Sequence, residues 1–146
     1  MASKNARDIM TDSPAVSTQD TTAREAAQMM EQNDCGSLPV VESRDSMKLI
    51  GMVTDRDLAL RVLGRGLNPD TKVREAMTRN VSSVKLDDDL DAVERVMSGQ
   101  QVRRVPVVDD RDRVAGIIAQ ADLARELESV GRKDFSRVVE KISQPG

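Results

Sequence analysis

Short apolar runs and amphipathic stretches follow one another along the chain in a fixed order. Two mostly apolar runs, Leu38–Val41 and Leu49–Thr54, flank a polar stretch, a pattern that predicts two neighbouring strands joined by a loop. The stretch before them predicts a helix with one apolar face, because its apolar residues recur at i, i+3, i+4 and i+7. These residues are Ala23, Ala26, Ala27 and Met30.

Polar and small residues mark where the predicted elements begin and end. Thr22 followed by Glu25 has the spacing of a capping box at a helix start. A short strand is expected before this helix, around residues 15–17. A second helix is expected from about Asp55 to Leu63, with Gly64 ending it.

The whole pattern occurs twice. Three segments recur in the same order: 6–11 as 73–78, 38–41 as 105–108 and 51–59 as 116–124. The offset between the copies is 67 residues for the first two pairs and 65 for the third. The change of offset falls in the polar stretch 42–48, where a loop tolerates a change of length. The second copy is therefore expected to repeat the elements of the first.

The repeat predicts an α+β fold made of two β-α-β-β-α units. In the second unit the strands are expected at about 82–84, 105–108 and 114–119, and the helices start near Leu90 and Gln120. One such unit is too small to bury much core, so we expect the two to pack sheet to sheet with pseudo-two-fold symmetry. The predicted domains are repeat 1 at 6–66, repeat 2 at 73–130, and a C-terminal helix and tail at 131–146.

Composition narrows the classes of function. Apolar residues make up 38% of the chain and charged residues 32%, as in an ordinary globular protein. Phe135 is the only aromatic residue, so the core must be aliphatic and no base-stacking surface is expected. The net charge is −3 and no basic run stands out, which argues against nucleic-acid binding.

Histidine is absent and Cys35 is the only cysteine. This removes the serine-type triad, most zinc sites and an internal disulfide, so we expect no enzyme, no metal and no required cofactor. The chain has no apolar stretch long enough to span a bilayer and no signal-peptide core at its start. A cytoplasmic protein without a membrane partner is therefore expected.

The repeated motifs resemble the CBS domain, and two in tandem resemble a Bateman module. In both copies a Met-Thr pair precedes the strand and helix. A Pro-Val-Val strand follows, and then glycine, apolar residues and a helix with aspartate in its first turn. The resemblance covers about residues 6–128 and is similar to stand-alone bacterial CBS-pair proteins. It implies a regulatory module that binds AMP, ADP, ATP, NAD or S-adenosylmethionine in clefts between the repeats, forms a homodimer and acts on an effector protein.

Asp57 and Thr54 are the candidates for the nucleotide's ribose, with Thr54 also suited to a phosphate oxygen. One carboxylate accepts both hydroxyls of a diol, and the free N–H groups of a helix start favour anions. The same two residues also have the spacing of a capping pair that merely starts the helix. Spacing by itself favours the capping role, whereas the resemblance favours ligand binding by Asp57.

The resemblance to the CBS pattern also implies which residues form the slot for the adenine base. By their positions in that pattern, the candidates are Thr11, Ala15, Cys35, Gly36 and Ser37. Gly36 would let a base approach the main chain closely. Pro39 lacks an N–H, so its strand is expected to be peripheral or interrupted there, or simply to start late. Cys35 is interpreted as a small apolar residue, because no base or second thiol accompanies it.

The resemblance to CBS modules makes Arg103 and Arg104 the candidates for binding phosphate, because related modules often have phosphate-binding basic residues just before this strand. Arginine is a suitable residue type, since it forms forked hydrogen bonds to phosphate oxygens. Arg56 and Arg61 are further candidates. The alternative for Arg103 and Arg104 is a solvated edge or a salt bridge to the acidic run 87–89. That run lacks the spacing and glycine of a calcium loop, and an acid-rich helix start explains it better.

The second repeat departs from the pattern. Ala119 replaces the threonine, Asp122 is kept, and Arg103 stands where the first repeat has Gly36. We therefore expect one good nucleotide site, and a weaker or empty second site made of Thr78, Ser82 and Asp122. Two other functions stay open: a ligand-free interaction or dimerisation module, and a nucleotide or phosphodiester hydrolase.

Overall fold

A computed structural model describes residues 4–100 and 102–129. The predicted C-terminal helix and tail at 131–146, with Phe135, lie outside this range. The chain divides into two compact units, and each is described by itself. Of the described residues, the first-repeat unit comprises 14–81 and 111–114, and the second-repeat unit comprises 4–13, 82–100, 102–110 and 115–129.

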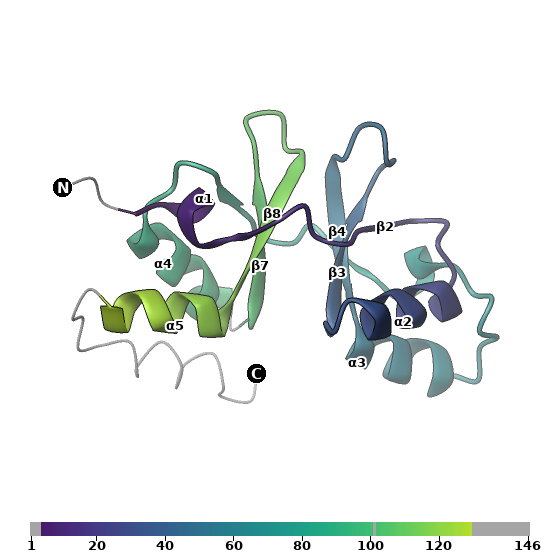
Figure 1. Cartoon of the computed structure of the whole chain (residues 1–146). Coiled ribbons are helices and arrows are strands. Elements are labelled where there is room, and N and C mark those ends of the chain that lie inside the picture. The colour runs from purple at the N-terminus through teal and green to yellow at the C-terminus, as the bar shows by residue number, and fades with distance from the viewer. Residues whose placement is uncertain (1–3, 101, 130–146) are drawn as a thin grey trace. The chain divides into compact units, whose positions relative to one another are not determined.

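A four-stranded sheet forms the first-repeat unit, in the order β2-β3-β4-β5 (Figure 1). Its strands are β2 (Ser17–Thr18), β3 (Ser37–Val41), β4 (Leu49–Thr54) and β5 (Thr78–Arg79). Strand β2 is parallel to β3, whereas β4 is antiparallel to both β3 and β5. The helices are α2 (Ala23–Gln32), α3 (Asp55–Leu58), a π-helix (Ala59–Leu63) and a 3₁₀ turn (Val73–Glu75).

The second-repeat unit has a matching four-stranded sheet in the order β1-β8-β7-β6. Its strands are β1 (Thr11–Asp12), β6 (Val84–Lys85), β7 (Arg104–Val108) and β8 (Val114–Ala119). Its helices are α1 (Ala6–Ile9), α4 (Leu90–Gln100) and α5 (Gln120–Ser129). The α+β fold class and the two-fold repetition of its elements are therefore as predicted.

The first segment of each repeat joins the sheet of the other repeat, and we call residues 6–12 and 73–79 the exchanged segments. Strand β1 pairs with β8, and β5 pairs with β4. Glycine allows this close approach, because a Cβ at Gly51 would lie 2.5 Å from the carbonyl oxygen of Thr78. At Gly116 the corresponding Cβ would meet the Met10 side chain and the Thr11 carbonyl. The compact units are thus not the contiguous repeats, and the boundaries 6–66 and 73–130 stay a prediction.

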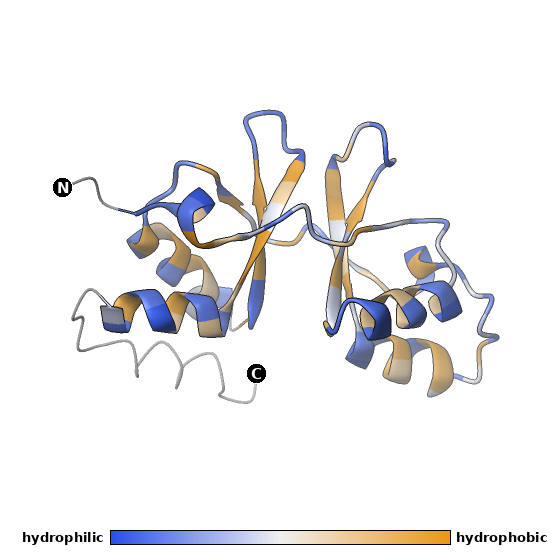
Figure 2. Cartoon of the chain, viewed as in Figure 1, coloured by the Kyte–Doolittle hydropathy of each residue, from blue (hydrophilic) through white to orange (hydrophobic). Residues whose placement is uncertain are grey.

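Each unit has an aliphatic core that includes residues of its exchanged segment. Much of β3, β4, β7 and β8 is coloured as hydrophobic in Figure 2. In the first-repeat unit the core cluster contains Ala26, Met30, Leu38, Val40, Val53, Val73 and Met77. In the second-repeat unit Ala6 packs with Val84, Leu90, Val93, Met97, Val105, Val107, Ile118, Leu123 and Leu127. Burial of Val73, Met77 and Ala6 therefore fastens the exchanged segments to their sheets.

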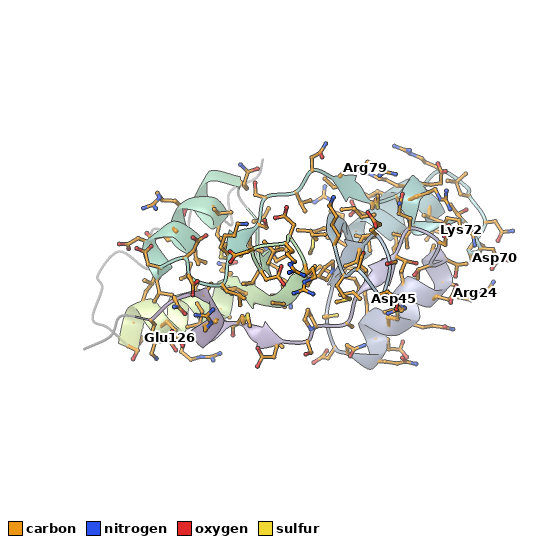
Figure 3. The ribbon with its side chains drawn as sticks, turned by 90° about the horizontal axis from the view of Figure 1, so that it is seen from above. Arg24, Asp45, Asp70, Lys72, Arg79 and Glu126 are labelled. Atoms are coloured by element: carbon orange, nitrogen blue, oxygen red, sulfur yellow. The ribbon has the colours of Figure 1, made fainter. Side chains whose placement is uncertain are left out.

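The connection between the repeats is hydrogen-bonded to the start of α2. The N–H of Ala23 donates to the carbonyl of Thr71, and that of Arg24 to the carbonyl of Pro69, at 2.8 and 3.0 Å. The side chain of Arg24 also pairs with Asp70 at 3.6 Å, and both lie near Lys72 at one end of this unit (Figure 3). Residues 69–71 of the connection are therefore bound to the start of α2 in the first-repeat unit.

The helix starts match the predictions more closely than the helix faces. Thr22 Oγ1 accepts from the N–H of Glu25, and the Glu25 carboxylate accepts from the N–H of Thr22, both at 3.1 Å. The capping box at α2 is confirmed. Ala23, Ala26 and Met30 are buried as expected, but Ala27 is exposed, so the predicted apolar face was too wide by one residue.

Candidate functional site

Ser37 and Thr54 face each other across the β3–β4 pair. Directly opposed residues of antiparallel strands project to the same face of a sheet. Their neighbours Leu38 and Val53 pack with α2 in the core cluster, so Ser37 and Thr54 belong to the opposite face. The hairpin therefore places two hydroxyl groups beside each other where β4 passes into α3.

Thr54 and Asp57 form a reciprocal cap at the start of α3. Thr54 Oγ1 accepts from the N–H of Asp57, and Asp57 Oδ2 accepts from the N–H of Thr54, both at 3.0 Å. The capping role weighed from the sequence is thus present. It occupies one carboxylate oxygen with a main-chain donor, and Oδ1 lies 3.9 Å from Nε of Arg61. The Asp57 side chain is 16% exposed, so its position is fixed while a part stays accessible.

The Ser37 hydroxyl is buried and has no hydrogen-bond partner among the described residues. Ser37 is 8% exposed. A buried polar group left without a partner costs about 1–3 kcal/mol, so such a group calls for a ligand or water. The Ser37 hydroxyl is one of three such buried side-chain oxygens among the described residues, and it lies at a corner of the first-repeat unit where a polar ligand group would be stabilised.

Gly36 brings the main chain of β3 against the start of α3. Its carbonyl accepts from the N–H of Asp55 at 2.9 Å, and a Cβ at Gly36 would lie 3.0 Å from the Asp55 carboxylate. Ala15 and Cys35 are half-buried and pack against the nearby core cluster. The packing of Cys35 agrees with its interpretation as a small apolar residue.

Pro39 lies in the middle of β3, which is an inner strand of the sheet by order. Strand β2 pairs only with Val40 and Val41, so it stops short of Pro39. The missing N–H of Pro39 therefore interrupts no pairing with β2. The prediction of a peripheral strand is therefore met only for residues 37–39 of β3, which pair with β4 and not with β2.

The corresponding corner of the second-repeat unit is built differently. The N–H of Gln120 donates to the Arg103 carbonyl at 2.7 Å, just as that of Asp55 does to Gly36. The Asp122 carboxylate accepts from the N–H of Ala119 at 3.1 Å, but Ala119 has no hydroxyl to return the bond. This corner keeps the carboxylate and lacks the hydroxyl pair, because Arg104 and Ala119 replace serine and threonine.

The sequence predicted one main nucleotide site and one weaker site, and the residues of each predicted site are distributed over both compact units. The first-repeat unit contains Ala15, Cys35, Gly36, Ser37, Thr54, Asp57 and Thr78. The second-repeat unit contains Thr11, Ser82, Arg103, Arg104 and Asp122. Thr78 thus shares a unit with Asp57, to which the sequence did not assign it. The roles of all these residues in binding stay a prediction.

The acidic run before α4 makes structural contacts. Asp87 pairs with Arg7, Asp88 accepts from the N–H of Lys85, and Asp89 accepts from the N–H of Ala92. Within the ranges 4–100 and 102–129, no group of three acidic, cysteine or histidine residues is arranged to hold a metal ion. In the same ranges no helix is long and apolar enough to cross a membrane.

Comparison with known proteins identifies stand-alone relatives of similar length. The chain is 38% identical over 118 residues to the CBS domain-containing protein YhcV of Bacillus subtilis, covering 81% of each. It is 37% identical over 123 residues to Hypoxic response protein 1 of Mycobacterium tuberculosis, covering 84% of each. The crystal structure of that second protein, described with two coordinated zinc ions, has a TM-score of 0.77 and covers 85% of this chain and 99% of that one.

Two further solved structures hold adenosine-containing ligands. The CBS domain pair of MJ0100, in complex with 5′-methylthioadenosine and S-adenosyl-L-methionine, is 30% identical, with a TM-score of 0.77. It covers 88% of this chain and 99% of that one. CBSX2 in complex with AMP is 25% identical, with a TM-score of 0.73, and covers 88% and 98%.

The family model of the CBS domain matches this chain twice, at residues 6–64 and 73–129. The two matches include both repeats found by their internal similarity. With its two similar sheets and its stand-alone relatives, the chain belongs to the CBS-domain family, as a tandem pair of CBS domains.

Proposed function

We propose that this chain is a regulatory module that binds an adenosine-containing ligand, of the AMP, ADP, ATP or NAD type, and carries out no catalytic step. The ligand would use the corner formed by Ser37, Thr54 and Asp57. Binding would change the shape of the module or its affinity for an effector protein. Such a change requires that the ligand bind the two states with different affinities.

The buried Ser37 hydroxyl is the observation that carries this proposal. It lies opposite Thr54 and has no partner among the described residues, while Asp57 is held at the adjacent helix start by a main-chain hydrogen bond. A carboxylate in a fixed position accepts hydroxyl hydrogens without further ordering of the protein. Asp57 is therefore suited to a ribose, with its Oδ1 receiving one hydroxyl.

Other predicted residues would complete the slot. Ala15, Cys35 and Gly36, which belong to the same unit as Asp57, would contact the base. The adenine-slot role of Thr11 and the phosphate-binding role of Arg103 and Arg104 stay predictions from the sequence. The weaker second site predicted for Thr78, Ser82 and Asp122 stays a prediction, because Thr78 belongs to a different unit from Ser82 and Asp122. The ligands named in the structures of MJ0100 and CBSX2 share an adenosine group, which supports this class of ligand for a chain of the same fold.

The test is isothermal titration calorimetry with AMP, ADP, ATP, NAD, S-adenosylmethionine and 5′-methylthioadenosine. Asp57→Asn is compared with Asp122→Asn, because both variants keep an oxygen that accepts from the main-chain N–H at the helix start. A charged hydrogen bond contributes about 1.5–3 kcal/mol, so Asp57→Asn should weaken binding by roughly 10- to 150-fold.

The variant Asp122→Asn should leave the tighter binding within about twofold of wild type. Ser37→Ala should also weaken binding while raising the free energy of unfolding, because it removes a buried group without a partner. The proposal is wrong if none of these compounds binds wild type, or if Asp57→Asn binds as tightly as wild type.

A second function, that of an interaction module, is favoured by one observation. Leu60, Leu63 and Leu67 are 55%, 78% and 42% exposed at the end of the π-helix and the turn after it. Large exposed apolar side chains close in sequence are typical of an interface. We propose a second copy of this chain as the partner at this surface, giving a homodimer.

Analytical ultracentrifugation of wild type and Leu63→Asp tests the dimer. Leu63→Asp should shift the chain to monomer, and Asp34→Asn, an exposed change elsewhere in the same unit, should not. A wild-type monomer at high concentration would contradict the dimer and leave the ligand proposal unaffected.

A further inference from the structure

Arg61 links Asp57 to the first residues of the second repeat. Its Nε lies 3.9 Å from Asp57 Oδ1, and its Nη1 donates to the carbonyl of Ala76 at 3.1 Å. The carbonyl of Met77 is 3.4 Å from the same Nη1. The side chain is 41% exposed, so it is ordered by these contacts more than by burial. One guanidinium thus bridges a proposed ligand group and two adjacent main-chain carbonyls.

The carbonyls that Arg61 contacts lie just before strand β5. Ala76 is fully buried with Ala23 and Val62, and Met77 belongs to the core cluster of the first-repeat unit. Thr78 then pairs with Met52 in β4, and the chain continues to the second-repeat unit at residue 82. Arg61 therefore holds Ala76 and Met77 at the point where the chain enters strand β5.

The helix that carries Arg61 departs from ordinary α-helical geometry. Residues Ala59–Leu63 form a π-helix, and the N–H of Gly64 donates to the Ala59 carbonyl at 2.7 Å. Short π-helical turns within helices are frequent at functional sites. The corresponding residues of the second repeat, 124–128, lie within the α-helix α5. At these positions only the first repeat has a π-helix.

The second repeat also reverses the charge at this position. Glu126 is the counterpart of Arg61 at the offset of 65 residues, and it pairs with Lys4 at 2.7 Å. Figure 3 labels Glu126 on its helix. Asp122 has Arg125 instead, at 3.9 Å, with the Arg125 side chain 73% exposed. The bridge from a carboxylate to main-chain carbonyls is thus specific to the first repeat.

We propose that Arg61 is a positioning residue that couples the Asp57 carboxylate to the segment Ala76–Thr78. With no ligand, Asp57 and the two carbonyls share the charge of Arg61. A ribose hydroxyl that donates to Asp57 Oδ1 would reduce the negative charge facing Arg61 and strengthen its contacts to the carbonyls. Ligand binding at this site would thereby change how firmly the segment Ala76–Thr78 is held. The ligand part of this inference rests on the proposed function.

Hydrogen–deuterium exchange of the peptide covering residues 76–79 tests the coupling on the full chain without ligand. Arg61→Gln should make exchange in this peptide faster by about tenfold, because a charged donor to two carbonyls is lost. Arg125→Gln, the matched change beside Asp122, should leave the same peptide unchanged. Equal exchange in wild type and Arg61→Gln would overturn the proposal.

A double-mutant cycle separates coupling from a purely structural role. Asp57→Asn should change exchange at 76–79 when residue 61 is arginine and have no effect in the Arg61→Gln background. Equal effects in both backgrounds would contradict the proposal. This arm needs no ligand, so it decides the coupling even if no nucleotide binds and the proposed function fails.

The ligand arm uses the nucleotide that binds wild type most tightly in calorimetry. It should slow exchange at 76–79 in wild type and in Arg125→Gln. In Arg61→Gln at a saturating concentration the nucleotide should bind without this slowing. An unchanged response in Arg61→Gln would show that the signal does not pass through Arg61, and would leave the proposed ligand site standing.

Discussion

The two repeats share a backbone plan and differ at the start of the helix after their sheet hairpins. In the first repeat, threonine and aspartate exchange hydrogen bonds, a buried serine hydroxyl lies alongside, and the residue four positions on is Arg61. In the second, Ala119 returns no bond to Asp122, and Glu126 lies four positions on. Duplication has thus kept the geometry in both copies and the polar chemistry in one.

The difference shows which residues the fold needs and which it does not. Both corners have an aspartate that accepts from the main chain and both have a glycine under the exchanged segment. These features recur because each unit requires them. Ser37, Thr54 and Arg61 have no chemical equivalents in the second repeat, so the fold does not require them there. That contrast supports a role for the three in binding.

The largest expected effect concerns the two glycines. Gly51→Ala places a Cβ 2.5 Å from the Thr78 carbonyl oxygen, which cannot rotate away, whereas Gly116→Ala meets the flexible side chain of Met10 and lies further, at 2.8 Å, from the carbonyl oxygen of Thr11. We expect Gly51→Ala to lower the free energy of unfolding by about 1–3 kcal/mol, as overpacking does, and Gly116→Ala to cost less. Urea unfolding measures both, and a larger loss at Gly116 would break this comparison.

A medium effect is expected from exchanging the helix caps. Thr54→Ala removes the hydroxyl that accepts from Asp57, and should destabilise the chain by about 1 kcal/mol. Ala119→Thr supplies the missing hydroxyl to the N–H of Asp122 and should stabilise it by up to about 1 kcal/mol. Thermal unfolding of the two variants and of their combination, with stability restored in the combination, checks this. A destabilising Ala119→Thr would show that the two helix starts differ in backbone geometry as well.

The smallest expected effect is a pH-dependent contribution to stability at the start of α2 that the start of α4 lacks. The hydrogen bond from the Thr22 main chain lowers the pKa of Glu25, and Ala92 occupies the equivalent position in the second repeat. A carboxyl whose pKa is lowered on folding adds stability above its ordinary value, about 4.3, and this contribution is lost as the pH falls through the lowered pKa. Glu25→Gln should therefore be less stable than wild type at pH 7, with the difference shrinking as the pH falls through the lowered pKa of Glu25.

Urea unfolding at a series of pH values measures this difference. Glu31→Gln is the control, since it alters charge on the same helix beyond the first turn. A difference between Glu25→Gln and wild type that is constant from pH 7 to pH 3 would rule out the cap as its source.

Strong local patterns made most of the fold predictable from the sequence. The strand Leu49–Thr54, the strand Val114–Ala119 and the cap at Thr22 are confirmed because apolar runs and capping spacings act within a few residues. The exchange of segments was not predicted. Strands β1 and β5 have two residues each, too few for any periodicity to indicate a partner sheet.

The candidate site was predicted in part. Motif positions placed Gly36, Ser37, Thr54 and Asp57, and the structure brings these four together in one unit. The burial of Ser37 depends on packing that no local pattern encodes. The contacts of Arg61 were also not predicted, although its i, i+4 spacing from Asp57 was a visible signal for the first of them. Its carbonyl partners lie fifteen and sixteen residues further along the chain.

The exchanged segments have a consequence for synthesis on the ribosome. The main core cluster of the first-repeat unit draws on residues between Ala26 and Met77, so its apolar parts are all available once that stretch has emerged. The second core joins Ala6 to Leu127, so helix α1 has no sheet to pack on until strands β6, β7 and β8 have also been translated. Nascent chains cut after residue 81 should thus protect the first core from proteolysis and leave residues 5–12 open to cleavage.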